Sequence, residues 1–256
     1  MTDFSAAPPA PGAGDFSVGA VLKRSFSTYF ANFIPFTILA LIFYLPTLIL
    51  GFLQLSDLES GVPSTDPTGE IVGGLVSFIL TYILVGALVY GTVQHLGGER
   101  STLGQIISRG MSTIGPVIVV ALLLSLVIAL GFILLIVPGV FLTVAYAVVI
   151  PAAVVERPGI IGAFKRSWEL TKGYRWRVFG ILLILLVIMF VFAFVVGAIG
   201  GFTAFTTESF TILILVNYLI SAITGTVMSV MIAVIYHDLR VAKEGVSASQ
   251  LAAVFD

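Results

Sequence analysis

The sequence predicts an all-α integral membrane protein with six transmembrane helices and short amphipathic helices at the cytoplasmic interface. Hydrophobic residues make up 59% of the 256-residue chain and charged residues only 10%, whereas charged residues approach a quarter of a soluble domain. Uncharged apolar runs recur along the chain, and as helices they are long enough to cross about 30 Å of hydrocarbon. The basic residues also gather on one side of the resulting threading.

The chain divides into one predicted domain and two tails. Residues 1–15 are rich in Pro, Ala and Gly, a composition that predicts a disordered tail. They have neither an apolar core nor an early basic cluster, so a cleavable signal peptide is not expected. Residues 16–240 are predicted to form the six-helix membrane domain, and residues 241–256 a short cytoplasmic C-terminal tail.

Six apolar segments predict the spans: residues 34–54, 71–96, 114–137, 140–155, 178–200 and 211–236. The fourth is short, because at 1.5 Å per residue it covers only about 24 Å. Pro138 disfavours helix in the preceding residue, so a break is expected near Val137. Two interpretations stay open: residues 137–155 cross the bilayer fully, or Pro138 and Gly139 form the tip of a re-entrant hairpin.

The charges assign a direction to this threading. All 12 Lys and Arg residues fall on one side of it. The other side carries acidic residues alone: Asp57, Glu59, Asp66, Glu70 and Glu208. The positive-inside rule makes the basic side cytoplasmic, so both termini are expected in the cytoplasm.

Residues 156–177 hold half of the basic residues and predict an amphipathic helix in the cytoplasmic interface. Lys165, Arg166 and Lys172 lie on its polar face, and Arg175 and Arg177 follow just beyond. Each such charge near an anionic leaflet is worth about 1 kcal/mol. These five residues are therefore the candidates for binding anionic lipid headgroups. The alternative is that they only set the topology, which requires charge but no particular arrangement.

Two similar segments stand earlier in the chain. Each of the three has a Gly (Gly19, Gly104 and Gly162), then apolar residues, an Arg, a small residue and a large apolar one. Each precedes a pair of predicted spans, which favours a threefold unit of amphipathic helix and transmembrane hairpin. Independent basic juxtamembrane helices would give the same pattern, and this alternative stays open. In the third segment the apolar Phe164 and Trp168 are expected to dip toward the acyl chains.

Residues typical of enzyme chemistry are scarce. No Lys, Arg, Asp or Glu lies well inside a predicted span, and the chain has no cysteine. His237 and Asp238 together suggest a metal site or an acid–base pair, but a metal site needs three or four ligands. We therefore expect no catalytic residue, no metal, no cofactor and no enzymatic activity. The net charge of −1 gives no indication of nucleic acid as a partner.

Glu156 ends a long uncharged run at the membrane edge, directly before the basic helix. There a carboxylate favours the start of the helix or pairs with a nearby cation. We interpret Glu156 as a structural pin at the membrane edge rather than as a catalytic carboxylate.

Three stretches carry a family resemblance: VPGVFL at 137–142, PAAVVERPGIIGAFKRSWELTKGYRWRVFG at 151–180 and YHDLRVAKEG at 236–245. They resemble the YciC-type family of bacterial inner-membrane proteins, and also the membrane domain fused to some glycerophosphodiester phosphodiesterases. The matching positions are Pro138, Gly139, Glu156, Ala163, Arg166, Ser167, Trp168, Leu170, Thr171, Tyr236, Leu239 and Arg240. The resemblance implies a bacterial cytoplasmic membrane and an uncharacterised role. The chain has no room for a phosphodiesterase domain, so that activity is not expected.

Two functions fit these observations. The first is a non-enzymatic membrane protein, a scaffold or accessory subunit that interacts with anionic lipid or with an envelope protein. The alternative is a transporter or channel for an apolar or lipid-like molecule. A polar-lined cavity open to one face would favour the alternative.

Overall fold

The computed structural model describes residues 16–60, 68–99 and 102–245. Within these ranges the chain forms α-helices and no β-strand, which confirms the all-α class. The helices are α1 (Val18–Ala31), α2 (Phe33–Phe43), α3 (Leu45–Ser60), α4 (Thr68–Leu96), α5 (Leu103–Ser112), α6 (Ile114–Leu134), α7 (Ile136–Ala145), α8 (Val149–Val155), α9 (Ile160–Thr171), α10 (Arg175–Thr207) and α11 (Phe210–Glu244). The predicted tail at 1–15 lies outside the described residues, as do residues 246–256. Residues 241–244, the start of the predicted C-terminal tail, continue α11.

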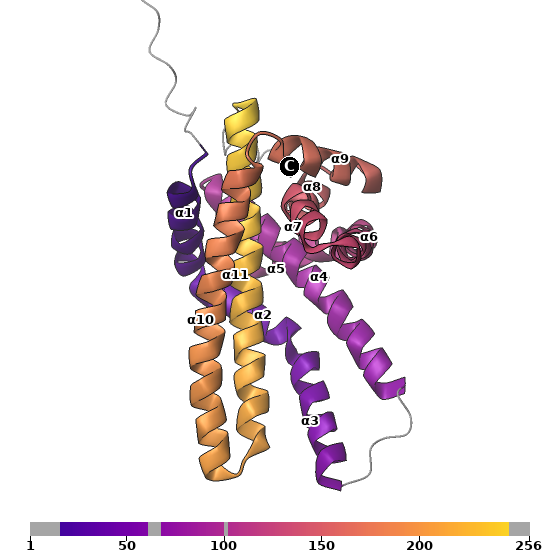
Figure 1. Ribbon diagram of the computed structural model, residues 1–256, viewed down its shortest axis with the longest axis vertical. Helices are drawn as coiled ribbons and strands as arrows, with labels where there is room; N and C mark the ends of the chain where they lie inside the picture. Colours follow the sequence, from indigo (N-terminus) through magenta and orange to yellow (C-terminus); the bar gives the residue numbers. More distant parts are fainter. Residues whose placement is uncertain (1–15, 61–67, 100–101, 246–256) are drawn as a thin grey trace, which may run out of the picture.

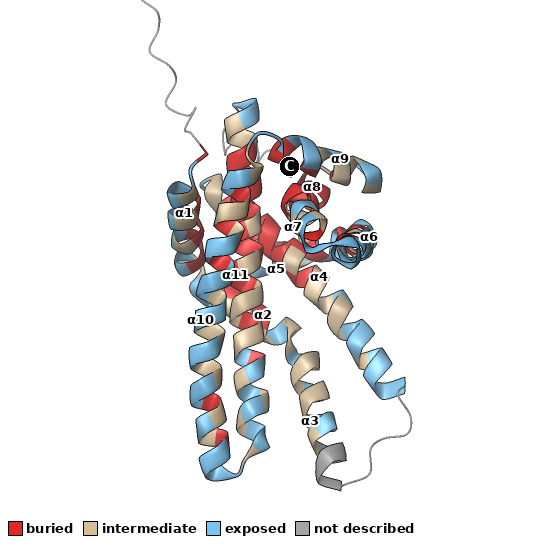
Figure 2. Ribbon diagram, in the orientation of Figure 1, coloured by how far each residue is buried: buried red, intermediate tan, exposed pale blue. Residues whose placement is uncertain are grey.

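Helix α11 is the element around which the others pack. It contacts α1, α2, α3, α4, α8, α9 and α10. Figure 1 shows α10 and α11 side by side along the long axis, while α3 and α4 diverge from them toward the lower end. Most residues between Thr226 and Leu239 are buried, and Figure 2 shows burial concentrated in the upper half. The core therefore sits where α1, α4 and α8 meet the C-terminal half of α11.

Prolines set most of the breaks between helices. Five of them, Pro35, Pro46, Pro116, Pro138 and Pro151, occupy the second or third position of α2, α3, α6, α7 and α8. Proline has no N–H to donate and its ring clashes with the carbonyl four residues earlier, so it is tolerated in a first turn but not in a helix interior. Each proline thus ends one helix and begins the next.

Side chains from other helices satisfy carbonyls that these breaks leave free. The Tyr218 hydroxyl of α11 donates to the carbonyl of Leu41, in the last turn of α2. Ser167 and Thr171 of α9 each donate to the carbonyl of Ala145, the last residue of α7, at 3.1 Å. Hydrocarbon supplies no water for such groups, so a helix break at membrane depth requires donors from the protein itself.

The apolar helices confirm the multi-pass class but not every predicted boundary. Five helical segments are long and apolar enough to cross a membrane, namely α4, α6, Ile136–Val155, α10 and α11. The count reaches six if α1 and α2, which are bent by 79°, form one span. The predicted first span at residues 34–54 was wrong as one continuous helix. It is divided at Tyr44, because Pro46 cannot donate to the carbonyl of Ile42.

The predicted break near Val137 is present, two residues earlier than expected. The chain turns at Leu135 rather than at Val137, because Pro138 is accommodated in the first turn of α7. Figure 1 shows α6 nearly end-on, so this hairpin crosses α10 and α11 steeply. Its tip, residues 132–137, is apolar and exposed. An uncharged tip suits hydrocarbon better than water, which favours the re-entrant interpretation.

The order of amphipathic helix followed by apolar helices occurs three times. Helix α1 precedes α2, α3 and α4; α5 precedes α6, α7 and α8; and α9 precedes α10 and α11. In each amphipathic helix the residue after the arginine is small and buried, namely Ser25, Gly110 and Ser167. A small residue there allows the helix to lie close against its neighbours. This recurrence supports the predicted threefold unit.

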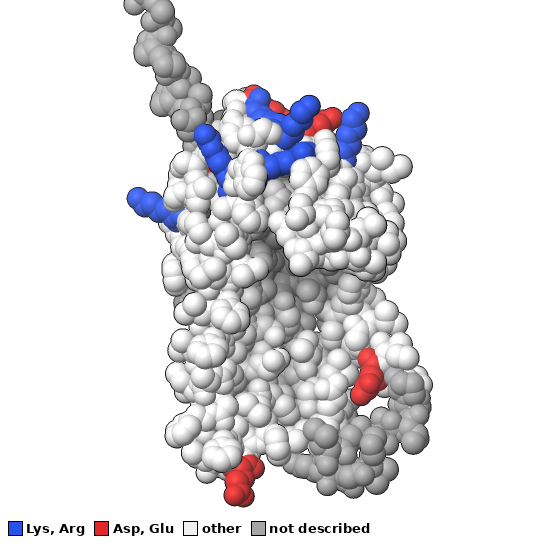
Figure 3. Space-filling view, viewed as in Figure 1, with Lys and Arg blue, Asp and Glu red and all other residues white. Residues whose placement is uncertain are grey.

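Charged side chains lie at two ends of the molecule. Figure 3 shows Lys and Arg gathered around the end formed by α1, α9, the start of α10 and the last turns of α11, which we call the basic end. Glu70 begins α4 and Glu208 separates α10 from α11 at the opposite, acidic end. The side chains of Asp57, Glu59, Asp66 and Arg100 lie outside the described part. The described charges follow the predicted sorting.

Two glycines of α5 test its close packing on α4. A Cβ at Gly110 would lie 2.7 Å from the backbone oxygen of Ile83, which cannot move aside, whereas a Cβ at Gly104 would meet nothing within 4 Å. We expect Gly110→Ala to lower the free energy of unfolding by about 1–3 kcal/mol. Gly104→Ala, the matched control, should be neutral or slightly stabilising. Thermal unfolding in detergent, followed by tryptophan fluorescence, measures both; equal midpoints would contradict this packing.

Candidate functional site

Helix α9 carries most of the predicted site and lies across the basic end. It follows Gly159, at φ 78°, and is followed by Gly173, at φ 89°. Both angles belong to the left-handed region, which glycine adopts without steric cost. These two turns allow the chain to leave α8, pass over α11 and enter α10.

A cluster of charged side chains, which we call the carboxylate joint, connects α8, α9 and α11. Its members are Glu156, Arg166, Tyr236, Arg240 and Glu244. Arg166 Nε donates to the two carboxylate oxygens of Glu156 at 2.9 and 2.7 Å, and the Tyr236 hydroxyl donates to Glu156 at 2.8 Å. Glu244 accepts from Arg166 Nη2 and, at 2.9 Å, from Arg240 Nε. Each carboxylate is therefore shared between two helices or two cations.

The joint has the contacts that a structural role for Glu156 requires. The Glu156 and Arg166 side chains are only 19% and 22% exposed, so water screens them weakly. Burial alone would lower the pKa of Arg166, but its hydrogen bonds to Glu156 and Glu244 outweigh burial and raise that pKa above its usual value. Arg166 therefore stays cationic and paired. The role of Glu156 as a pin remains a prediction.

Aromatic rings fill the space between α9 and α7. Trp168 packs edge-on against Phe141 at 5.8 Å, and Phe164 against Tyr146 at 5.1 Å. Phe164 and Trp168 therefore contact α7 and the turn that follows it, rather than only facing outward as expected. The reason is the break after Ala145, which brings Tyr146 beneath α9.

Arg175 stacks on these rings. Its guanidinium carbon lies 3.9 Å from the centre of the Trp168 ring and 4.9 Å from that of Phe141. Such contacts contribute about 0.5–2 kcal/mol each. Its Nε and Nη2 atoms are enclosed, yet neither has a hydrogen-bond acceptor among the described residues. A buried donor left in this way costs about 1–3 kcal/mol, and more when it is charged.

A groove of about 590 Å³ opens between α7 and the start of α10, and we call it the α7–α10 groove. Its volume lies within the range of about 300–1,000 Å³ that small-molecule sites occupy. The described lining consists of Ile136, Val137, Val140, Phe141, Val144, Gly173, Arg175, Trp176 and Phe179. Arg175 is the one charged residue in that lining. Trp176 is 85% exposed, as expected of a ring at a membrane interface.

The structure places the five predicted headgroup residues in three settings. Lys165 and Lys172 are exposed, and neither has an ion-pair partner in the described part of the chain. Arg177 is also exposed, and its Nη1 donates to the backbone carbonyl that precedes α1 at 2.8 Å. Arg166 is held in the carboxylate joint, and Arg175 lies against the Trp168 and Phe141 rings. The exposed cations are thus Lys165, Lys172 and Arg177.

Asp238 has a second partner besides the neighbouring His237. It forms an ion pair with Arg24 of α1, and its Oδ1 lies 2.9 Å from Nδ1 of His237. No group of three or more His, Asp and Glu side chains in residues 16–60, 68–99 and 102–245 could hold a metal ion. Asp238 therefore connects α1 to α11, as Glu244 connects α9 to α11. The spacing of Arg240 and Glu244, one helical turn apart, was the available indication of their pairing.

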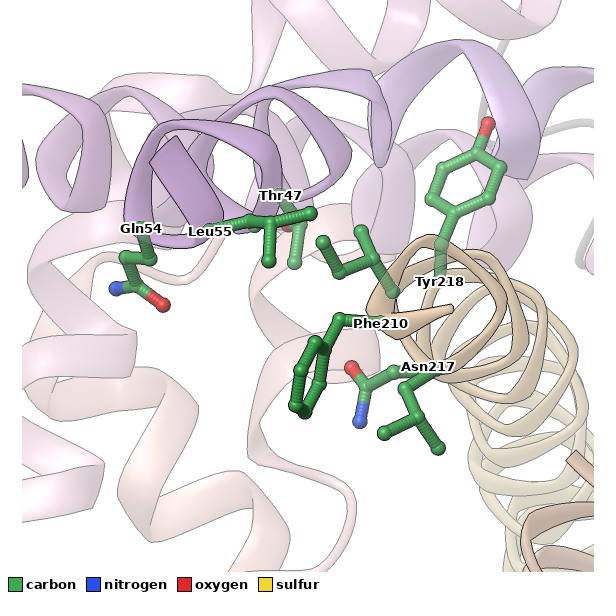
Figure 4. A pocket seen from close by; sticks show the side chains of 9 residues that line it. Thr47, Gln54, Leu55, Phe210, Asn217 and Tyr218 are labelled. Atoms are coloured by element: carbon green, nitrogen blue, oxygen red, sulfur yellow. The ribbon is translucent and has the colours of Figure 1, made fainter. Parts of the chain in front are cut away.

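A second cavity, of about 370 Å³, lies between α3 and α11. Figure 4 shows Gln54 and Asn217 at its wall, from the two helices, together with Thr47, Leu55 and Phe210. Its lining mixes amide and hydroxyl groups with apolar side chains. Apolar surface makes up most of the lining, so the cavity matches only in part the polar-lined cavity that would favour the transporter alternative.

Comparison with known proteins matches parts of the helical region to proteins of unknown function. The model of a domain of unknown function, DUF7847, matches residues 73–239. The UPF0259 membrane protein plu2479 of Photorhabdus laumondii is 30% identical over 94 residues, which are 37% of this chain and 37% of that protein. The chain thus matches little more than a third of this curated relative. No solved structure matches the chain. The similarity is to uncharacterised membrane proteins, and the narrower YciC-type and phosphodiesterase resemblances stay expectations.

Glu156→Gln tests the carboxylate joint. The substitution keeps the shape of the side chain but leaves Arg166 without its charged partner, and a hydrogen bond to a charged group contributes about 1.5–3 kcal/mol. We expect a lower unfolding midpoint in detergent and a lower yield in membranes. Glu169→Gln is the matched control, because Glu169 is exposed on α9 and has no ion pair among the described residues. Wild-type stability combined with a lost cellular phenotype would contradict the structural role.

Proposed function

The chain belongs to the family of the domain of unknown function DUF7847, and on that premise we propose that it is a non-enzymatic, multi-pass protein of the bacterial inner membrane. Its basic end interacts with anionic lipid, and the protein serves as a scaffold or as an accessory subunit of another envelope protein. The family description carries no activity, so the proposal rests on the site. The matching relative is described as a membrane protein, which agrees with the coarser part of the proposal.

The observation that carries the proposal is the surplus of exposed cations on α9 and α10. Glu156 and Glu244 lie nearby, but Arg166 and Arg240 already occupy them. In the described part of the chain Lys165, Lys172 and Arg177 therefore form no ion pair, and the exposed Glu169 on α9 offsets only part of their charge. Each cation near an anionic leaflet is worth about 1 kcal/mol, and the contributions do not add fully.

The orientation follows from the same charges. Lys and Arg are retained on the cytoplasmic side of membrane proteins, so the basic end and both termini face the cytoplasm in this proposal. The leaflet that carries anionic headgroups then meets the exposed cations directly.

The second candidate, a transporter or channel for an apolar or lipid-like molecule, is favoured by the cavity between α3 and α11 (Figure 4). The described residues that line it include no ionisable carboxylate, amine or guanidinium. Ion- and proton-coupled transport relies on such groups within the membrane. The cavity therefore supports passive passage or binding of a lipid-like molecule more than coupled transport.

Single-cysteine labelling tests the orientation, and the chain has no native cysteine to interfere. Thr206→Cys places a thiol at the exposed acidic end, and Glu169→Cys places one at the exposed basic end. A membrane-impermeant maleimide applied to intact cells should label Thr206→Cys only, and permeabilised cells should show both labelled. Labelling of Glu169→Cys in intact cells would reverse the proposed topology.

Lipid enrichment tests the exposed cations. In membranes of equal parts phosphatidylglycerol and phosphatidylcholine, the double variant Lys165→Gln/Lys172→Gln should lower the enrichment of phosphatidylglycerol around the protein about five- to thirtyfold, since roughly 1 kcal/mol is lost for each of the two charges and the contributions do not add fully. Native mass spectrometry of the extracted protein with its lipids measures this.

The control variant, Lys23→Gln/Arg157→Gln, removes the same charge from exposed positions elsewhere at the basic end. It should retain most of the enrichment. If both variants lose the phosphatidylglycerol enrichment, or if neither variant does, the lysines of α9 contribute only to net charge or topology and the proposed site is wrong.

A further inference from the structure

We propose that the α7–α10 groove is a specific site for one anionic glycerophospholipid, with its phosphate bound by Arg175 and one acyl chain along the apolar wall. This inference rests on the proposed function and names the ligand class of that basic end. It differs from general attraction to the leaflet, because it requires both a cation in a defined geometry and a groove.

The phosphate end is indicated by the guanidinium edge of Arg175. Nε and Nη2 lie on the same edge and donate parallel N–H bonds, the arrangement that binds phosphate or carboxylate with two hydrogen bonds. In Arg175 these are the two nitrogens without an acceptor among the described residues. The Trp168 and Phe141 rings pack edge-on against each other, and the guanidinium lies against both of them. Both nitrogens are enclosed, so a shift of these side chains accompanies phosphate binding.

The neighbouring arginines show what a satisfied guanidinium looks like in this protein. Arg166 donates to Glu156 and Glu244, and Arg177 donates to a backbone carbonyl. Arg175 belongs to the same cationic stretch, but among the described residues its contacts are with the aromatic rings of Trp168 and Phe141. An acceptor from outside the protein would complete its hydrogen bonding, and Lys172 lies exposed three residues away.

The chain end is indicated by the rest of the groove. Its wall is formed by apolar side chains of α7 together with Phe179, one turn further along α10 from Arg175. Ile136 and Val137 at the hairpin tip are 74% and 78% exposed, so this wall continues into the apolar surface of the protein. An inorganic phosphate would leave this apolar surface uncovered, whereas a phospholipid covers it. The groove therefore selects a lipid rather than a soluble anion.

The experiment counts tightly retained lipid on the full chain. The protein is reconstituted with phosphatidylglycerol and phosphatidylcholine, extracted in mild detergent and analysed by native mass spectrometry. We expect one phosphatidylglycerol to remain bound to the wild type. Arg175→Gln should reduce its retention about tenfold or more, as expected for a lost hydrogen-bonded charge. Equal retention of phosphatidylcholine would overturn the inference, and so would displacement of the bound phosphatidylglycerol by inorganic phosphate alone.

A second variant keeps the test decisive if Arg175→Gln does not fold. Val140→Trp fills the groove and leaves Arg175 in place, so it should also lose the retained lipid. Leu186→Trp adds the same ring to an exposed position of α10 outside the groove and should retain it. If a folded Arg175→Gln or Val140→Trp retains lipid like the wild type, the groove is not the site.

The same measurement separates this inference from the proposed function. Lys165→Gln/Lys172→Gln should reduce the loosely associated phosphatidylglycerol but leave the tightly bound molecule. If Lys165→Gln/Lys172→Gln loses the general enrichment but Arg175→Gln keeps the tightly bound lipid, the groove is not the site and the proposed function stands. If Lys165→Gln/Lys172→Gln keeps the general enrichment but Arg175→Gln loses the tightly bound lipid, the exposed lysines do not have the proposed role and the groove stands.

Discussion

Proline has no amide hydrogen, and in an apolar protein that missing donor shapes the whole molecule. Five prolines in the first turns of helices divide the apolar segments into shorter pieces. Each division frees carbonyl groups that hydrocarbon cannot solvate. The positions of Tyr218 on α11 and of Ser167 and Thr171 on α9 follow from this requirement, because their hydroxyls supply the missing hydrogen bonds.

The docking of α9 on the end of α7 has two consequences for the basic end. It brings Arg166 to Glu156, so that the last residues of α8 and the last turns of α11 are connected through shared carboxylates. It also packs Trp168 edge-on against Phe141, and the Arg175 guanidinium lies against both rings. One hydrogen-bonding requirement in α7 thus positions both the ion pairs that stabilise the site and the cation that remains available.

The sequence predicted the features that depend on local pattern. Apolar length predicted the helical membrane class, charge sorting predicted the two ends, and the uncharged run before Glu156 indicated a carboxylate near a basic helix. The sequence did not predict the pairing of Asp238 with Arg24, which are far apart in the chain, because such contacts depend on packing. The break at Tyr44 was missed since mean apolarity does not register a proline. The contact of Arg175 with Phe141 and Trp168 was also missed, because it depends on the packing of α7, α9 and α10.

The long pair formed by α10 and α11 has a consequence for the surrounding bilayer. The two helices contain 33 and 35 residues, and their uncharged stretches, residues 178–207 and 210–236, are about 45 and 40 Å long against about 30 Å of hydrocarbon. Such hydrophobic mismatch is accommodated by helix tilt or by local thickening of the bilayer, and its free energy grows with each ångström of difference. The thickness of the membrane, and therefore the length of its acyl chains, affects how far α10 and α11 tilt.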